Sequence, residues 1–160
     1  MTDTTAWTSR DHWRALAPAL HVEDRDFILA VPEFALDPQR GQALAGRIRH
    51  EGYCELFPRQ WGVPLAKMAA LVTRLADARV PTPFAFIYDE FWLLYCQLHA
   101  MIGAVLGPGY LRLPDFWAWH VDPRRGEAGW GPHRDKGHAS IRPDRSPRAL
   151  TVWIALTDAT

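Results

Sequence analysis

Two residues with metal-binding side chains, His133 and Asp135, lie two positions apart near the end of the sequence. In an extended segment, residues i and i+2 project to the same face, so an imidazole and a carboxylate at this spacing can converge on one cation. A nitrogen donor together with a hard oxygen donor suits Fe(II). The pair suits magnesium less well, because magnesium sites use oxygen donors. A second histidine would complete a facial triad and leave three positions for a chelating cosubstrate and O2. The pair therefore predicts part of a non-haem iron site in an oxygenase.

A His-x-Asp pair is common by chance, so the neighbouring sequence decides how strongly it indicates a metal site. It follows an aromatic segment and the dipeptide Gly131-Pro132, and a second apolar segment comes after it. The neighbouring His138 is out of register for a compact site, and we expect it to be a loop residue. His133-Arg134-Asp135 also matches a protein-kinase catalytic triplet, but a kinase requires Asn five residues after the Asp, where this chain has Ser140. The sequence also has no kinase Gly-rich loop, which excludes a kinase.

The elements that position this pair are predicted to be helical first and extended afterwards. Capping residues and apolar residues at helical spacing predict helices over residues 9–16, 37–50, 63–78 and 89–106. A short strand is expected over 53–57. Alternating aromatic and branched residues then predict strands over 110–122 and 148–156, with a loop over 123–131. Helices followed by strands are typical of an α+β domain.

The composition fits one soluble domain spanning residues 1–160, mainly helical over 1–109 and extended over 110–160. Hydrophobic residues make up 48% and charged residues 22% of the chain, and Lys plus Arg equals Asp plus Glu at 18 each. This balance gives no electrostatic case for binding nucleic acid or an anionic membrane surface. The N-terminus lacks a signal peptide, and Gln97 and His99 interrupt the longest apolar stretch. We therefore expect a cytoplasmic protein in which Cys54 and Cys96 are reduced thiols.

Three segments together resemble the phytanoyl-CoA dioxygenase family. They are Phe116-Trp117-Ala118-Trp119-His120, then Pro132-His133-Arg134-Asp135, then Leu150-Thr151-Val152-Trp153-Ile154-Ala155-Leu156-Thr157-Asp158-Ala159. Members of that family are Fe(II)- and 2-oxoglutarate-dependent oxygenases. The resemblance is clear over residues 110–160 and only general before them.

The resemblance implies a fold, two cofactors and a set of site residues. The fold would be α+β, with N-terminal helices packed on a partial double-stranded β-helix, a jelly-roll of the cupin-like kind. His133 and Asp135 would be iron ligands, while Thr151 and Trp153, together with Trp119, would line the pocket for 2-oxoglutarate. The substrate would be a small organic molecule that undergoes hydroxylation. We assign no residue as a general acid, a general base or a nucleophile, and the substrate's identity and the oligomeric state stay open.

The chain departs from the family after Ala159. The family continues with a Pro-Gly-Ser-His strand, a second histidine as third iron ligand, and an arginine that pairs with the distal carboxylate of 2-oxoglutarate. The sequence stops at Thr160 without them, so we expect the N-terminal part of a C-terminally truncated oxygenase. The alternative is an inactive, truncated or degenerate oxygenase domain with at most a binding role. A metal-dependent hydrolase on a cupin-like barrel is a third interpretation, but it would need a further ligand that activates water.

Overall fold

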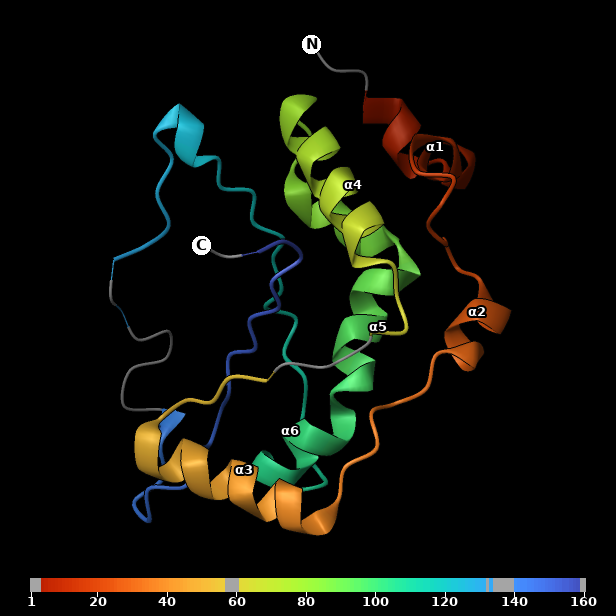
Figure 1. Ribbon diagram of the computed structural model, residues 1–160. Coiled ribbons are helices and arrows are strands. Elements are labelled where there is room, and N and C mark those ends of the chain that lie inside the picture. Colours follow the sequence, from red (N-terminus) through yellow and green to blue (C-terminus); the bar gives the residue numbers. More distant parts are fainter. Residues whose placement is uncertain (1–3, 57–60, 132, 134–139, 159–160) are drawn as a thin grey trace.

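The computed structural model describes residues 4–56, 61–131, 133 and 140–158. Within these ranges the α-helices are α1 (Arg10–Leu16), α2 (Arg25–Ala30), α3 (Pro38–Glu51), α4 (Leu65–Asp77), α5 (Asp89–Gln97) and α6 (His99–Leu106). Short 3-10 helices form η1 (Thr4–Thr8), η2 (Thr82–Ile87) and η3 (Pro123–Arg125). Helices α4 and α5 both pack against η2, α3 packs against α6 at one end, and the chain after α6 runs along the bundle in extended form (Figure 1).

Local capping chemistry sets the helix ends, as the sequence predicts. The Ser9 side chain accepts a hydrogen bond from the backbone N–H of His12 at the start of α1, at 3.3 Å. Asp37 caps α3 in the same way, with Pro38 at the first helical position. Gly52 ends α3 with φ 84°, a left-handed conformation that glycine adopts without steric cost. The helices predicted over 9–16, 37–50 and 63–78 are confirmed as α1, α3 and α4.

The predicted helix over 89–106 is wrong in one respect, because the structure divides it into α5 and α6 at Leu98. In a continuous helix the carbonyl of Gln97 would accept a hydrogen bond from the amide four residues later. Here it accepts one from the backbone N–H of Phe34 at 2.9 Å. The Gln97 side chain also accepts from the backbone N–H of Gly62 at 2.8 Å. Two segments that are distant in sequence thus bond to Gln97 at the helix break. The local sequence therefore does not predict where the helix is divided.

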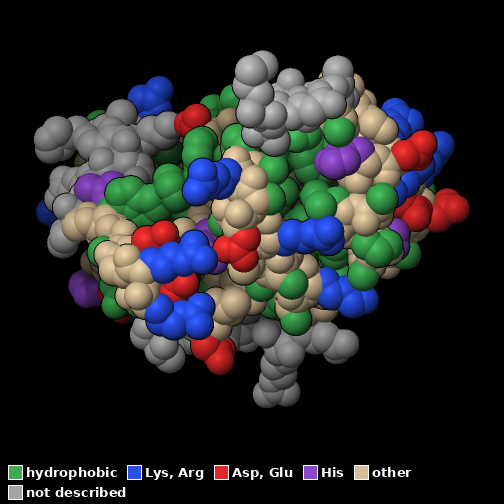
Figure 2. All heavy atoms as spheres, turned by 90° about the horizontal axis from the view of Figure 1, so that it is seen from above, with side chains coloured by type: hydrophobic (Ala, Val, Ile, Leu, Met, Phe, Trp, Pro, Cys, Tyr) green, Lys and Arg blue, Asp and Glu red, His purple; other side chains and the backbone are tan. Residues whose placement is uncertain are grey.

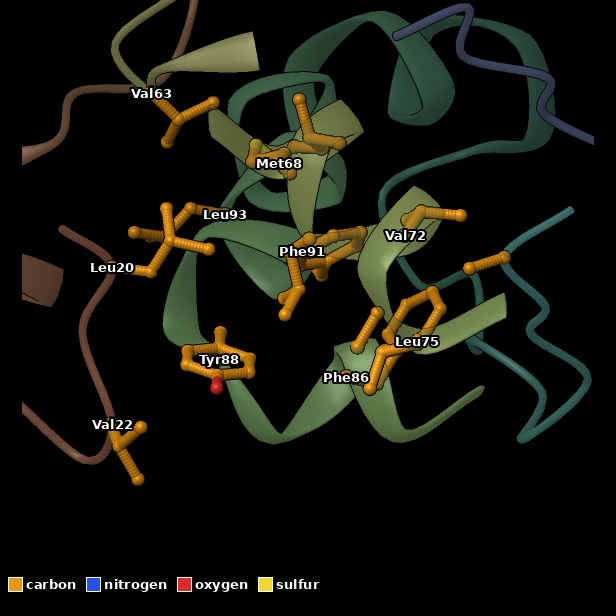
Figure 3. Packing of buried hydrophobic residues seen from close by; sticks show 14 of the residues in the cluster. Leu20, Val22, Val63, Met68, Val72, Leu75, Phe86, Tyr88, Phe91 and Leu93 are labelled. Carbon is orange, nitrogen blue, oxygen red and sulfur yellow. The ribbon is translucent and has the colours of Figure 1, made fainter. Parts of the chain in front are cut away.

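The hydrophobic core is formed mainly by α4, η2 and α5. Met68 and Leu75 of α4 are almost completely buried, and they face Phe91 of α5 and Phe86 of η2 (Figure 3). The α4 residues recur three and four positions apart, which gives one apolar helix face. The region before α2 contributes to the same core through Trp13, Leu20 and Val22.

Two buried carboxylates at the start of α5 attach the segment between α1 and α2 to this core. Glu90 is fully buried, and its carboxylate accepts the His21 backbone N–H at 3.1 Å and lies 2.7 Å from His21 Nδ1. Asp89 accepts the backbone N–H groups of Glu23 and Asp24 at 3.2 and 2.8 Å. A buried carboxylate is tolerated when charge-assisted hydrogen bonds replace its lost hydration. These contacts place α2, which the sequence did not predict, against the bundle.

The predicted strands over 110–122 and 148–156 are wrong. Both segments are extended, but the structure contains no strand in the described residues, only an isolated antiparallel bridge between Ile141 and Pro147. Several of their backbone groups bond to side chains and turns instead of to each other. The Ala118 carbonyl accepts from the Thr82 hydroxyl, and the backbone N–H of Arg148 donates to the Ser140 carbonyl at 2.8 Å. A β-sheet requires a continuous ladder between strands, and these bonds replace it.

The expected α+β class with a partial double-stranded β-helix is therefore wrong for the described residues, which are helical with extended segments and no sheet. The short strand predicted over 53–57 is not found at Tyr53–Leu56 either, and Phe57 lies outside the described residues. Two-residue periodicity in the sequence identified an extended backbone, but the side expected to face inward, with Thr151 and Trp153, is exposed. The periodicity did not identify a partner for that backbone, because pairing depends on distant residues.

Hydrogen exchange distinguishes an extended segment from a paired strand. Backbone amides of Trp117, Trp119 and Val121 are expected to exchange quickly, because no ladder protects them, whereas amides in the middle of α4 exchange slowly. Mass spectrometry of overlapping peptides after a short labelling pulse measures the difference. Protection of the residue 117–121 peptides as strong as that of α4 would contradict the unpaired arrangement.

Glu90→Ala is expected to destabilise the fold by about 2–4 kcal/mol, because it leaves the buried His21 backbone N–H without its acceptor and creates a cavity. Denaturant unfolding followed by circular dichroism measures this change as a lower midpoint. Glu51→Ala is the control, because Glu51 is exposed and pairs only with Arg47 on the same helix, so its midpoint should stay close to that of the wild type. Equal midpoints for the two variants would contradict the role assigned to Glu90.

Candidate functional site

His133 is exposed and lies just after the extended loop that leads out of η3. Its Nδ1 lies 2.8 Å from the backbone carbonyl oxygen of Gly131. A carbonyl oxygen can only accept, so in this contact Nδ1 carries the hydrogen, and the neutral ring has its lone pair on Nε2. Histidines that bind metals commonly donate their second ring N–H to a carbonyl in this way, which fixes the tautomer and the ring orientation. The local geometry of His133 fits that of a metal ligand.

The second predicted ligand, Asp135, lies outside the described residues, and so does His138. The distance between the His133 and Asp135 side chains is therefore not defined by the structure. In the part of the chain that is described, no three histidine, cysteine, aspartate or glutamate side chains gather as a metal-binding group. The metal pair stays a prediction from the sequence, supported on the His133 side by the contact with Gly131.

The three residues predicted to line the cosubstrate pocket are all exposed. Trp119 is 50% exposed and Trp153 is 69% exposed, and Thr151 lies on the same side of its segment as Trp153. The alternate residues Ile154 and Leu156 pack against the hydrophobic core instead. The side predicted to face a pocket is thus the side that points away from the helices.

Trp119 and Trp153 belong to one continuous aromatic surface with two further tryptophans. The Trp119 and Trp130 ring centroids are 4.1 Å apart with planes at 69°, and those of Trp130 and Trp153 are 5.9 Å apart at 74°. Trp117 extends the row from Trp119 at 5.1 Å and 31°. We call Trp117, Trp119, Trp130 and Trp153 the tryptophan surface. Because Trp130 lies three residues before His133, this surface and the predicted metal ligand are adjacent in the chain.

Packing of the inner residues onto the helices positions the tryptophan surface. Phe116 contacts Phe86 of η2 with centroids 4.4 Å apart and Trp92 of α5 at 4.9 Å. Ala118, two residues later, is buried in the same core. Successive side chains of an extended segment project to opposite sides, so the burial of Phe116 and Ala118 directs Trp117 and Trp119 outward. Hydrophobic side chains open to solvent lie between charged groups on the face seen in Figure 2.

A charged turn then carries the chain from Trp119 to Trp130. The Asp122 carboxylate accepts from the backbone N–H and the guanidinium Nε of Arg124, both at 3.0 Å. These hydrogen bonds, the guanidinium bond above all, lower the pKa of Asp122. Arg125 reaches Asp77 at the end of α4 at 3.2 Å, and Glu127 accepts the backbone N–H of Asp122 at 2.7 Å. Both arginines of this turn therefore have structural partners, which is the arrangement expected of a loop scaffold.

Two open hollows lie away from the tryptophan surface. One of about 500 Å³ lies along residues 14–26, where Arg14, His21 and Arg25 alternate with Glu23, Asp24 and Asp26. The other, of about 430 Å³, lies between α3 and α6 and is lined largely by small residues such as Gly41, Ala45 and Ala104. Neither of these two hollows is lined by a predicted site residue.

The comparisons with known proteins do not place the chain. No protein-family model matches it, and no significant match exists among the curated proteins or the solved structures. The resemblance to phytanoyl-CoA dioxygenases therefore rests on the sequence motifs alone. Among the described helices, none has the length and apolar character needed to cross a membrane.

Sequence reasoning named Trp119 and Trp153 but not Trp130, the ring that joins them. Trp130 lies in a Gly-rich loop outside any periodic pattern, so periodicity could not have found it. Its position immediately before Gly131-Pro132-His133 was the available signal.

The tryptophan surface should be detectable by its exciton coupling in far-ultraviolet circular dichroism, since indole rings this close interact strongly. Trp130→Phe removes the central ring and is expected to weaken the coupling signal, because it eliminates the Trp119–Trp130 and Trp130–Trp153 pairs and leaves only the Trp117–Trp119 pair of this surface. Trp61→Phe is the control, because Trp61 contacts Phe34 and lies outside the tryptophan surface. An unchanged spectrum for Trp130→Phe would contradict the described ring arrangement.

Proposed function

We propose that this protein is an Fe(II)- and 2-oxoglutarate-dependent dioxygenase that hydroxylates a small organic substrate, with His133 and Asp135 as two of its iron ligands. The observation that carries the proposal is His133, which stands in a His-x-Asp motif and whose Nδ1 is bonded to the Gly131 carbonyl. In the tautomer that this bond favours, the lone pair that would bind a metal is on Nε2, and an imidazole nitrogen with a carboxylate two residues later in the sequence is a donor set that Fe(II) accepts. The proposal concerns the chemistry of this site and does not require a jelly-roll fold of the described residues.

Each residue has a defined task in this proposal. His133 donates Nε2 in an orientation fixed by Gly131, and Asp135 supplies a hard oxygen and a negative charge. Thr151 offers a hydroxyl that can donate to a carboxylate of 2-oxoglutarate, while Trp119 and Trp153 provide apolar walls. A bound ferrous ion would supply O2 activation coupled to the oxidative decarboxylation of 2-oxoglutarate. The protein's own contribution is ligation and orientation of the reacting groups.

Anaerobic addition of Fe(II) and 2-oxoglutarate to the purified protein tests the proposal. Chelation of Fe(II) by 2-oxoglutarate in a protein site produces a weak visible charge-transfer band, which we expect for the wild type. His133→Ala and Asp135→Ala are each expected to weaken Fe(II) binding by about 10-fold or more, because each removes a direct ligand. The same titration, followed by absorbance, measures both variants.

His138→Ala is the matched control, since it removes an imidazole from the same stretch of chain and is expected to leave the band unchanged. A His133→Ala protein that binds Fe(II) as the wild type does would refute the ligand assignment. Absence of the band from the wild type, together with no thermal shift on addition of 2-oxoglutarate, would refute the dioxygenase proposal and favour the binding role considered from the sequence.

A further inference from the structure

The tryptophan surface exposes far more aromatic area than folding of the described residues requires. Trp117, Trp119, Trp130 and Trp153 are each between 48% and 69% exposed. With roughly 150–250 Å² per buried aromatic side chain, their open area reaches about 400 Å². A single patch of this size is typical of a binding surface in a soluble protein.

We propose that this surface binds a quaternary ammonium group and that the substrate of the proposed dioxygenase carries such a group. Only the statement that the ligand is the dioxygenase's substrate rests on the proposed function. The binding site itself is defined by Trp119, Trp130 and Trp153, whose ring planes meet at 69° and 74°. Indole has the strongest affinity of the natural side chains for cations through its π face.

The angles between the rings favour a compact cation over a flat ligand. A planar aromatic molecule can stack on one indole face, but the neighbouring plane, turned by about 70°, then meets it edge-on. A trimethylammonium group is nearly spherical and carries its positive charge on its outer C–H groups. It can therefore contact two π faces set at such an angle at once. Another indole of this chain already binds a cation, since the Arg112 guanidinium lies 5.2 Å from the ring centroid of Trp92.

The charge of the proposed iron site points to the same ligand. The ferrous ion carries two positive charges, the Asp135 carboxylate one negative charge and 2-oxoglutarate two, so the assembled site bears a net negative charge. Trp130 lies three residues before His133, and a cation held there would sit close to that negative charge. The same arrangement would disfavour an anionic substrate.

Choline and its neutral carbon isostere, in which a tert-butyl group replaces the trimethylammonium group, test the proposal directly. The two ligands have nearly the same shape and differ in charge. Without Fe(II) or 2-oxoglutarate, quenching of intrinsic tryptophan fluorescence is expected to show that choline binds about fivefold more tightly than the isostere. Trp130→Leu keeps apolar bulk but removes the central π face, and it is expected to abolish the preference for choline.

Tyr53→Leu is the control variant, because Tyr53 is an exposed aromatic residue outside the tryptophan surface and its loss should leave the preference intact. Equal affinity of the wild type for both ligands, or no binding of choline, would overturn the proposal. The wild-type comparison needs no variant, so a misfolded Trp130→Leu protein could not rescue it. An iron charge-transfer band without choline binding would refute the cation site alone, whereas choline binding without the band would refute only the dioxygenase.

Discussion

The packing of Phe116 and Ala118 onto η2 and α5 is the constraint on which the candidate site depends. Phe116 lies 4.4 Å from Phe86, centroid to centroid, and Ala118 is buried beside it. Because side chains alternate along an extended backbone, burial of these two residues forces Trp117 and Trp119 to the opposite side. The helices thus hold this segment through Phe116 and Ala118, and Trp117 and Trp119 point outward. The stability of the helical bundle and the exposure of the aromatic surface follow from the same contacts.

A second constraint acts at the start of α5, where Glu90 and Asp89 bond to the backbone between α1 and α2. Both carboxylates are buried, so each needs its partners to offset the lost hydration. This requirement fixes the start of α5 and, through α5, the position of Trp92, against which Phe116 packs. The polar contacts near α2 and the aromatic contacts near the tryptophan surface therefore act through one helix.

The sequence predicted what local chemistry determines and failed where distant residues decide. The ends of α3 follow from Asp37, Pro38 and Gly52, all of which act within one helical turn. The division at Leu98 depends on the amide of Phe34, which no local pattern reveals. The strand predictions failed for the same reason: alternation identified extended segments, but a sheet also needs a paired backbone, and the side predicted to face inward at Thr151 and Trp153 is the exposed side. Within the candidate site, Trp119 and Trp153 were named through the family resemblance, whereas Trp130 was not named.

The short link between Trp130 and His133 couples the two proposed binding events. The Gly131 carbonyl accepts the His133 Nδ1–H, so the residue next to Trp130 also sets the orientation of the imidazole. A ligand that holds the Trp130 ring against Trp119 restricts the backbone at Gly131 and hence the direction of Nε2. A backbone that the first ligand has ordered loses less conformational entropy when the second ligand binds, and linkage requires the effect to be reciprocal. Binding of a cation on the tryptophan surface and binding of a metal at His133 would therefore change each other's affinity by the same factor.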